Sequence, residues 1–171
     1  MVINFKDVVF NLVSLSDLEN IRSFNCENKS MESYLKEEAY FEHISREAST
    51  TVVYYADKLI AYFTLHRLPI EFEEAGTAPR DALDLARMAV SKEFQQMGIG
   101  SFVITHLRSV AYSINERYLT TEALYEKWKW YVRRGFRYIF EDDIDPNSTE
   151  GFVSMVMDLF DEELLKDYFE V

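Results

Sequence analysis

The stretch Gln95-Gln96-Met97-Gly98-Ile99-Gly100 places two glycines one residue apart in a chain that has five glycines in all. Glycine weakens regular structure and is useful where the backbone turns sharply or approaches a ligand closely. The flanking sequence predicts a strand over 83–90 and a helix over 101–115. Because the first amides of a helix lack intrahelical partners, a glycine loop at this junction is suited to bind a phosphate group.

Length and composition predict one globular domain that spans 1–171, since 171 residues with 48% hydrophobic content can bury a continuous core. The apolar runs are shorter than the roughly 20 residues that cross a bilayer, and the first residues lack the layout of a signal peptide. We therefore expect a cytoplasmic protein without a membrane partner. Cys26 is the single cysteine, and no His/Asp/Glu cluster shows ligand spacing, so neither a disulfide nor a metal is expected.

The charge balance limits the possible partners. Thirty acidic residues against eighteen basic ones give a formal net charge of −12. Such a field repels polyanions and attracts cations at long range. Nucleic acid is therefore not the expected partner, and a cationic acceptor is favoured. The acidity can also serve solubility alone.

The remaining sequence predicts helices and strands that together form a mixed sheet. A capping box of Ser16 and Glu19 predicts a helix over 17–24, and a second helix follows Ser30. Two segments rich in β-branched and aromatic residues, 51–55 and 59–65, predict a hairpin. The tail predicts strands over 137–140 and 152–159, an acidic turn over 141–146 and a helix over 160–169. That last helix can pack on the sheet or on a second subunit, so a homodimer is possible.

Two segments in this order resemble a known family. Leu85-Ala86-Arg87-Met88-Ala89-Val90 precedes the glycine loop, and Tyr131-Val132-Arg133-Arg134-Gly135-Phe136 follows farther along the chain. They are similar to the Q/R-x-x-G-x-G/A signature and the Y-x-x-x-G-F segment of the GNAT superfamily of N-acetyltransferases. The resemblance covers about residues 50–160. It implies an α/β (α+β) GNAT fold, in which a mixed central sheet with a splayed strand pair is flanked by helices.

The resemblance also implies acetyl-CoA as co-substrate. In the family the loop amides hold the pyrophosphate, and the end of the preceding strand bonds the pantetheine through its backbone. The expected acetyl-CoA contacts are Met88, Ala89, Val90, Gln95, Gln96, Met97, Gly98, Ile99 and Gly100. The commoner loop reads Q-G-R-G-x-G, so Gln96 and Met97 depart from it and remove a positive side chain near the phosphates.

The same resemblance assigns chemistry to Tyr131, which we expect to protonate the departing thiolate as a general acid. The alternative is a core tyrosine packed beside Trp128 and Phe136. The base that deprotonates the amine stays open among several residues. The candidates are Glu71, Glu73, Glu74, Asp84, Glu122 and His66.

Three further side chains are expected to take no part in the reaction. His43 and His106 lie on predicted helices, and we expect both at the surface. Cys26 has no neighbouring cation or base in the sequence that would activate it, so a buried structural thiol is expected.

These features predict an N-acetyltransferase that moves an acetyl group directly to a primary amine, of a cationic small molecule or a protein. A second resemblance keeps one alternative open. Phe24-Asn25-Cys26-Glu27-Asn28, with the segment 31–39, is similar to the F-D/N/S-C-G-N opening of toxin-related GNAT proteins that acetylate aminoacyl-tRNA, and Glu27 replaces the glycine there. A patch of Arg133, Arg134 and Arg137 could help such a protein to hold tRNA. The other alternative is a non-catalytic, CoA-binding GNAT-like module.

Overall fold

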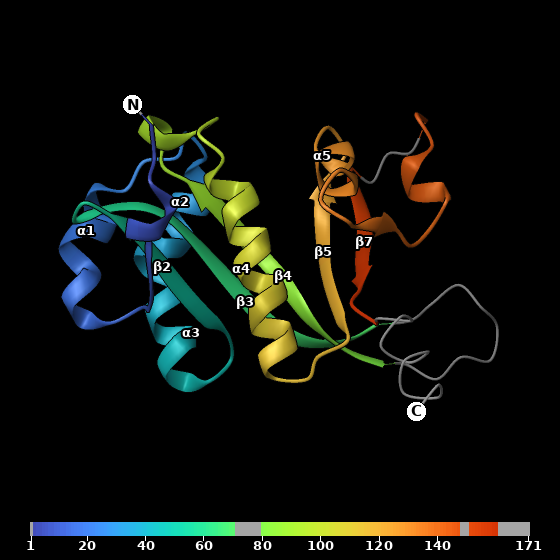
Figure 1. The fold of residues 1–171 in the computed structure, drawn as a ribbon, viewed down its shortest axis with the longest axis horizontal. Helices are drawn as coiled ribbons and strands as arrows, with labels where there is room; N and C mark the ends of the chain where they lie inside the picture. The colour runs from blue at the N-terminus through green and yellow to red at the C-terminus, as the bar shows by residue number, and fades with distance from the viewer. Residues whose placement is uncertain (1, 71–79, 148–150, 161–171) are drawn as a thin grey trace. The chain divides into compact units, whose positions relative to one another are not determined.

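The computed structural model describes residues 2–70, 80–147 and 151–160, and Figure 1 shows the path of the chain. Seven strands form a mixed sheet in the order β1-β2-β3-β4-β5-β7-β6, with helices flanking it. The predicted fold class is therefore confirmed. The chain divides into two compact units, residues 1–68 with 84–106 and residues 69–83 with 107–171.

The strands of the first unit are β1 (Val9–Leu12), β2 (Ser49–Tyr55), β3 (Lys58–Ile70) and β4 (Arg80–Val90), of which β3 and β4 begin or end in the second unit. Strands β2 and β3 form the predicted antiparallel hairpin. Their connection is the two-residue turn Ala56–Asp57, with φ of 48° and 61°. Two positive φ angles match the twist of the flanking strands. Strand β1, which the sequence did not predict, pairs antiparallel with β2.

The two faces of this hairpin bury different side chains, because successive residues of a strand point to opposite faces. Val52 and Tyr62 are fully buried in one core with the helices α1 (Leu18–Ser23) and α2 (Lys29–Glu37). On the other face, the ring of Phe63 contacts Phe10 of β1 and His106 of α4 (Ile99–Ser113). Both faces of the first unit's strands are therefore covered by helices.

The amino-terminal helices begin close to the predicted positions, but the first cap differs. Asp17 Oδ2 accepts hydrogen bonds from the Ser14 amide at 2.8 Å and from the Ser14 hydroxyl at 2.9 Å. The capping box therefore pairs Ser14 with Asp17 instead of Ser16 with Glu19. Helix α2 begins at Lys29, and Asn28 Oδ1 accepts from the Met31 amide at 3.2 Å. A third helix, α3 (Ala39–Ser45), carries His43, which the sequence placed on a helix, and Arg46 caps its end with φ of 67°.

The second unit contains β5 (Tyr118–Leu124), α5 (Trp128–Val132), β6 (Arg137–Tyr138) and β7 (Phe152–Asp158). Strand β7 pairs antiparallel with both β5 and β6. The predicted strand over 152–159 is confirmed and the one over 137–140 is shorter. The acidic turn contains a 3-10 turn over Asp142–Ile144, where the buried Asp143 accepts from the Ser154 amide at 2.8 Å. The predicted helix over 160–169 lies, beyond Phe160, outside the described residues.

Candidate acetyl-CoA site and catalytic tyrosine

The glycine loop joins β4 to α4 in the first unit, and Gly98 forms its last turn. Gly98 has φ of 85°, a left-handed conformation that favours glycine. Its carbonyl accepts from the Phe102 amide at 3.0 Å, which begins the hydrogen bonding of α4. A Cβ at this position would lie 3.3 Å from Cζ of Phe5. Both backbone conformation and space therefore require glycine at 98.

The first turn of α4 has the properties of an anion site. The amides of Ile99 and Gly100 precede the first intrahelical bond of a helix that is 15 residues long. The macrodipole of such a helix favours negative charge at this end. Gly100 is the second residue of the helix and lies in its first turn. A residue without a side chain at this point lets a phosphate group approach the backbone closely.

Gln96 and Met97 occupy the two positions at which the loop departs from the commoner motif. Gln96 is exposed and has φ of 63°, so its backbone keeps the left-handed form that glycine adopts most readily. Met97 is half-buried and uncharged. The nearby cation Lys92 pairs with Glu27, whose Oε1 lies 2.7 Å from Nζ and raises the pKa of Lys92.

The end of β4 is held in place from two sides. The Ser91 amide donates to the carbonyl of Ile60 in β3 at 2.8 Å. The carbonyl of Val90 accepts from Nε2 of Gln95 at 3.1 Å. Ala89 is buried in the core under α1 and α2, whereas Met88 and Val90 are half-buried. The strand end predicted to bond the pantetheine is therefore a fixed element of the first unit.

Tyr131 lies in the second unit, near the end of α5. Its ring meets Trp130 and Phe136 edge to face, with ring centroids 4.9 and 5.5 Å apart. Burial raises the pKa of Tyr131, and a hydrogen bond with Thr121 and the charge of Arg134 oppose the rise. The phenol is thus protonated at neutral pH, which is the form that a general acid requires. A tyrosine that is only packed in the core would make the same ring contacts, so the role of Tyr131 as a general acid stays a prediction.

The base candidates are distributed over several elements. Glu71, Glu73 and Glu74 lie outside the described residues. Asp84 is half-buried on β4, Glu122 is exposed on β5, and His66 is half-buried on β3. The identity of the base stays open. Among the described residues, no group of three His, Cys, Asp or Glu side chains could hold a metal ion.

The prediction that His43 and His106 are surface residues was wrong. His106 is half-buried and stacks on Phe10, with centroids 3.8 Å apart and planes within 5° of parallel. Burial lowers the pKa of His106. His43 is also half-buried, and its Nδ1 accepts from the Thr50 amide at 3.2 Å. Both imidazoles therefore have structural contacts.

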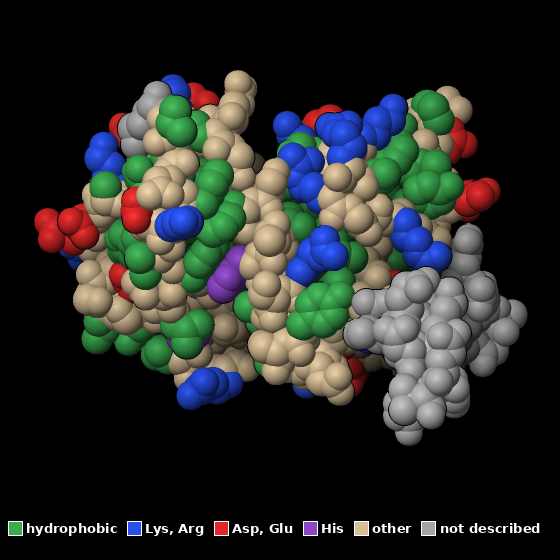
Figure 2. All heavy atoms as spheres, in the orientation of Figure 1, with side chains coloured by type: hydrophobic (Ala, Val, Ile, Leu, Met, Phe, Trp, Pro, Cys, Tyr) green, Lys and Arg blue, Asp and Glu red, His purple; other side chains and the backbone are tan. Residues whose placement is uncertain are grey.

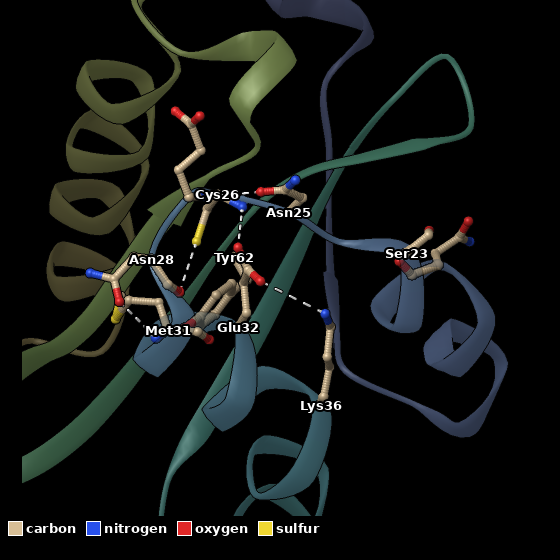
Figure 3. A network of polar contacts seen from close by, with 10 residues as sticks. Ser23, Asn25, Cys26, Asn28, Met31, Glu32, Lys36 and Tyr62 are labelled. Carbon is tan, nitrogen blue, oxygen red and sulfur yellow. Dashed lines mark hydrogen bonds and ion pairs between the residues drawn. The ribbon is translucent and has the colours of Figure 1, made fainter.

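Cys26 is the buried structural thiol that the sequence predicted. It is 8% exposed, and burial is the main cause that raises the pKa of its thiol. The thiol donates to the carbonyl of Asn28 at 3.6 Å, as Figure 3 shows. A thiol that is buried and kept protonated in this way is a poor nucleophile.

Comparison with known proteins assigns the family. The model of the acetyltransferase (GNAT) family matches residues 13–136, so the chain belongs to the GNAT acetyltransferase family. An uncharacterized N-acetyltransferase, BH2580, of Halalkalibacterium halodurans is 25% identical over 107 residues. That alignment covers 63% of this chain and 62% of the relative, which is less than two thirds of the relative's length.

Solved structures of toxins share the fold over nearly the whole chain. AtaT complexed with acetyl-methionyl-tRNAfMet has a TM-score of 0.70 at 16% identity and covers 95% of this chain and 99% of the toxin. A tyrosine-to-phenylalanine mutant of AtaT, bound to acetyl-CoA and the C-terminus of the antitoxin AtaR, has a TM-score of 0.68 at 18% identity, covering 94% and 98%. A KacTA–DNA complex has a TM-score of 0.63 at 22% identity, covering 95% and 98%.

These matches confirm the predicted family and, with it, acetyl-CoA as the co-substrate. At identities below 25% the structural matches establish the fold and leave the acceptor open. Within the described residues, no helix combines the length and the apolar character needed to cross a bilayer.

Proposed function

We propose that this protein transfers an acetyl group directly from acetyl-CoA to the primary amine of a cationic small molecule or of a protein. The observation that carries the proposal is the left-handed turn at Gly98, which leads into the open amides of α4. The first amides of a helix and the positive end of its dipole are suited to bind a phosphate group. Family membership supplies the reaction class.

The proposed reaction uses two proton transfers. A neutral amine attacks the thioester carbonyl, so a C–N bond forms while the C–S bond breaks. The phenol of Tyr131 gives its proton to the departing thiolate, and the amine's surplus proton passes to a base that is not yet identified. The net charge of −12 favours acceptors that carry positive charge.

A direct test measures free CoA that is released from acetyl-CoA in the presence of a panel of amines, and mass spectrometry then identifies the acetylated product. The panel should contain polyamines, an aminoglycoside and lysine-containing peptides. Release with at least one amine supports the proposal. Tight binding of acetyl-CoA by calorimetry, with no release for any acceptor including aminoacyl-tRNA, would instead indicate the non-catalytic module.

One observation favours a second candidate, the acetylation of aminoacyl-tRNA. The segment 127–138 contains no Asp or Glu, and we call its five cations the basic segment. Its members are Lys127, Lys129, Arg133, Arg134 and Arg137. All but Arg134 are exposed, and Figure 2 shows Lys and Arg side chains gathered in this part of the surface.

Aromatic rings interleave with these cations. The guanidinium of Arg134 lies 3.5 Å from the centroid of Trp130, and Nζ of Lys129 lies 5.4 Å from that of Trp128. Cations beside aromatic rings are a common surface for unpaired nucleic acid. The basic segment is therefore a local exception to the acidic field of the chain.

Anisotropy titration with aminoacyl-tRNA at several salt concentrations tests this candidate. Our first proposal predicts no appreciable binding at physiological salt. Binding that weakens steeply with salt and is lost in Arg133→Glu, but kept in the control Arg22→Glu of the first unit, would place aminoacyl-tRNA first among the acceptors.

A further inference from the structure

Two loops of the first unit are hydrogen-bonded to each other. The loop 25–28 joins α1 to α2, and the loop 91–98 joins β4 to α4. The Lys92 amide donates to the carbonyl of Asn25 at 2.8 Å, and Nε2 of Gln95 donates to the carbonyl of Cys26 at 3.1 Å. The ion pair of Lys92 with Glu27 adds little, since both side chains are more than half exposed.

The side chain of Gln95 makes a second hydrogen bond besides the one to the loop 25–28. Its Nε2 also donates to the carbonyl of Val90 at 3.1 Å. A side-chain amide has two N–H donors, and here the protein uses both. Gln95 therefore ties the last residue of β4 to the loop 25–28 through two backbone carbonyls.

The loop 25–28 is itself firmly held, as Figure 3 shows. The Cys26 amide donates to Oε1 of Glu32 at 3.0 Å, and Oε2 of Glu32 lies 4.0 Å from Nζ of Lys36. The Glu27 amide donates to Oδ1 of Asn25 at 3.0 Å. Together with the Asn28 cap of α2, these contacts attach the loop that accepts the Gln95 hydrogen bond to helix α2.

The geometry points to Gln95 as a positioning residue for acetyl-CoA. It holds the end of β4 and the start of the glycine loop in the arrangement in which their backbone groups meet the pantetheine and the pyrophosphate. A site that is already in its bound shape loses less conformational freedom on binding. The inference rests on the proposed function, because it concerns the same acetyl-CoA site.

The experiment compares Gln95→Glu with Asn11→Asp, which also turns a side-chain amide into a carboxylate but on an exposed residue of β1, outside the acetyl-CoA loop. Calorimetry measures acetyl-CoA binding, and steady-state kinetics separates the two substrates. We expect Gln95→Glu to raise the Kd and KM for acetyl-CoA about tenfold or more, with the KM for the acceptor nearly unchanged. Asn11→Asp should stay within about twofold of wild type, because Asn11 lies on the edge strand β1 and not in the loops that Gln95 joins.

Two further variants and one further readout complete the test. Gln95→Arg keeps N–H donors and should restore most of the affinity. Gln95→Met removes the donors without adding charge and takes the place of Gln95→Glu should the latter unfold. Hydrogen exchange of the Lys92 amide in the ligand-free protein should be faster in both donor-less variants.

The possible failures are distinguishable. Equal acetyl-CoA affinity in Gln95→Glu, Gln95→Met and Asn11→Asp would overturn the positioning role and leave the proposed function intact. Absence of acetyl-CoA binding by the wild-type protein would overturn the proposed function and this inference with it.

Discussion

Glu27 and Gln96 share the same left-handed backbone conformation, with φ of 63° at each, and both stand where the related motifs have glycine. They lie on the two loops that Gln95 and Lys92 join. A left-handed conformation costs a residue with a side chain roughly 1–2 kcal/mol. At both positions a residue with a side chain therefore has the backbone shape that glycine adopts most readily, which places strain next to the acetyl-CoA loop.

Replacement of Gln96 by glycine should therefore stabilise the protein. The gain is the relief of the left-handed strain, reduced by the greater freedom of glycine in the unfolded chain, and we expect about 0.5–1 kcal/mol. Urea denaturation measures it as a higher midpoint with an unchanged slope. Gln96→Ala is the matched control, because alanine keeps the strain. A similar gain in both variants would show that the Gln96 side chain, and not the backbone, is the source.

Gly98 should not tolerate even alanine. A methyl group there meets Phe5 and the backbone has φ of 85°, so Gly98→Ala should lower the free energy of unfolding by roughly 1–3 kcal/mol. The thermal shift that saturating acetyl-CoA produces should also become smaller, because the loop amides move. A larger side chain, as in Gly98→Trp, should abolish that shift.

Gly151→Ala is the control for this prediction. Gly151 has φ of 73°, but a Cβ there would meet no atom within 4 Å. The substitution therefore carries backbone strain without a clash and lies in the other unit, so acetyl-CoA binding should be kept. Equal acetyl-CoA affinity in wild type and Gly98→Trp would refute the assignment of the loop.

Tyr54 links β2 to the amino-terminal cap and should make stability depend on alkaline pH. Its phenol donates to Oδ1 of Asp17 at 2.8 Å, and burial together with this bond raises the pKa of Tyr54 to about 12. A raised pKa means that the folded state holds the proton more tightly than the unfolded one. The stabilisation is therefore complete below the unfolded pKa of about 10 and is lost as the pH rises through about 12.

Tyr54→Phe tests this linkage. The variant removes the donor to Oδ1 of Asp17 and keeps the Ser14 bonds to Oδ2, so the free energy of unfolding should fall by about 1 kcal/mol at neutral pH. The loss of stability between pH 10 and 12 should also be smaller than in wild type. The neighbouring Tyr55→Phe serves as control. An identical alkaline profile in Tyr54→Phe and wild type would contradict the role of this phenol.

The elements around the acetyl-CoA loop could be predicted from the sequence alone. A hairpin of β-branched residues, a glycine turn and an amphipathic helix each have a recognisable local pattern of residue types. The cap of the first helix shows where local pattern fails. Both Ser14 with Asp17 and Ser16 with Glu19 fit the spacing, and the choice depends on Tyr54, which holds Asp17 from a distant strand.

Other features of the structure have no local sequence pattern from which they could be predicted. Strand β1 exposes Val9 and Leu12, so it lacks the alternation of a half-buried strand. Because β1 was missed, so was Phe10, the partner that buries His106. The bond from Gln95 ends on a backbone carbonyl 69 residues away, and a carbonyl has no residue type that a sequence could reveal.

Tyr131→Phe tests the chemistry of the proposed reaction. The substitution keeps the ring and its contacts with Trp130 and Phe136 and removes the phenolic proton. General-acid help is typically worth about 10²–10⁴-fold, so kcat should fall by roughly that factor. Acetyl-CoA affinity should change little, because the hydroxyl acts as charge develops on sulfur. Steady-state kinetics and calorimetry on the same preparations measure the two effects.

The pH profile separates a catalytic phenol from a structural one. Burial raises the pKa of Tyr131 above its ordinary value, so its titration does not limit the rate near neutrality. The difference between wild type and Tyr131→Phe should shrink at high pH, where the free thiolate leaves without a proton. Tyr138→Phe, the same change on β6, should leave kcat unaltered. Wild-type turnover in a folded Tyr131→Phe protein, under conditions where chemistry limits the rate, would remove this tyrosine from the mechanism and leave only the acetyl-CoA loop.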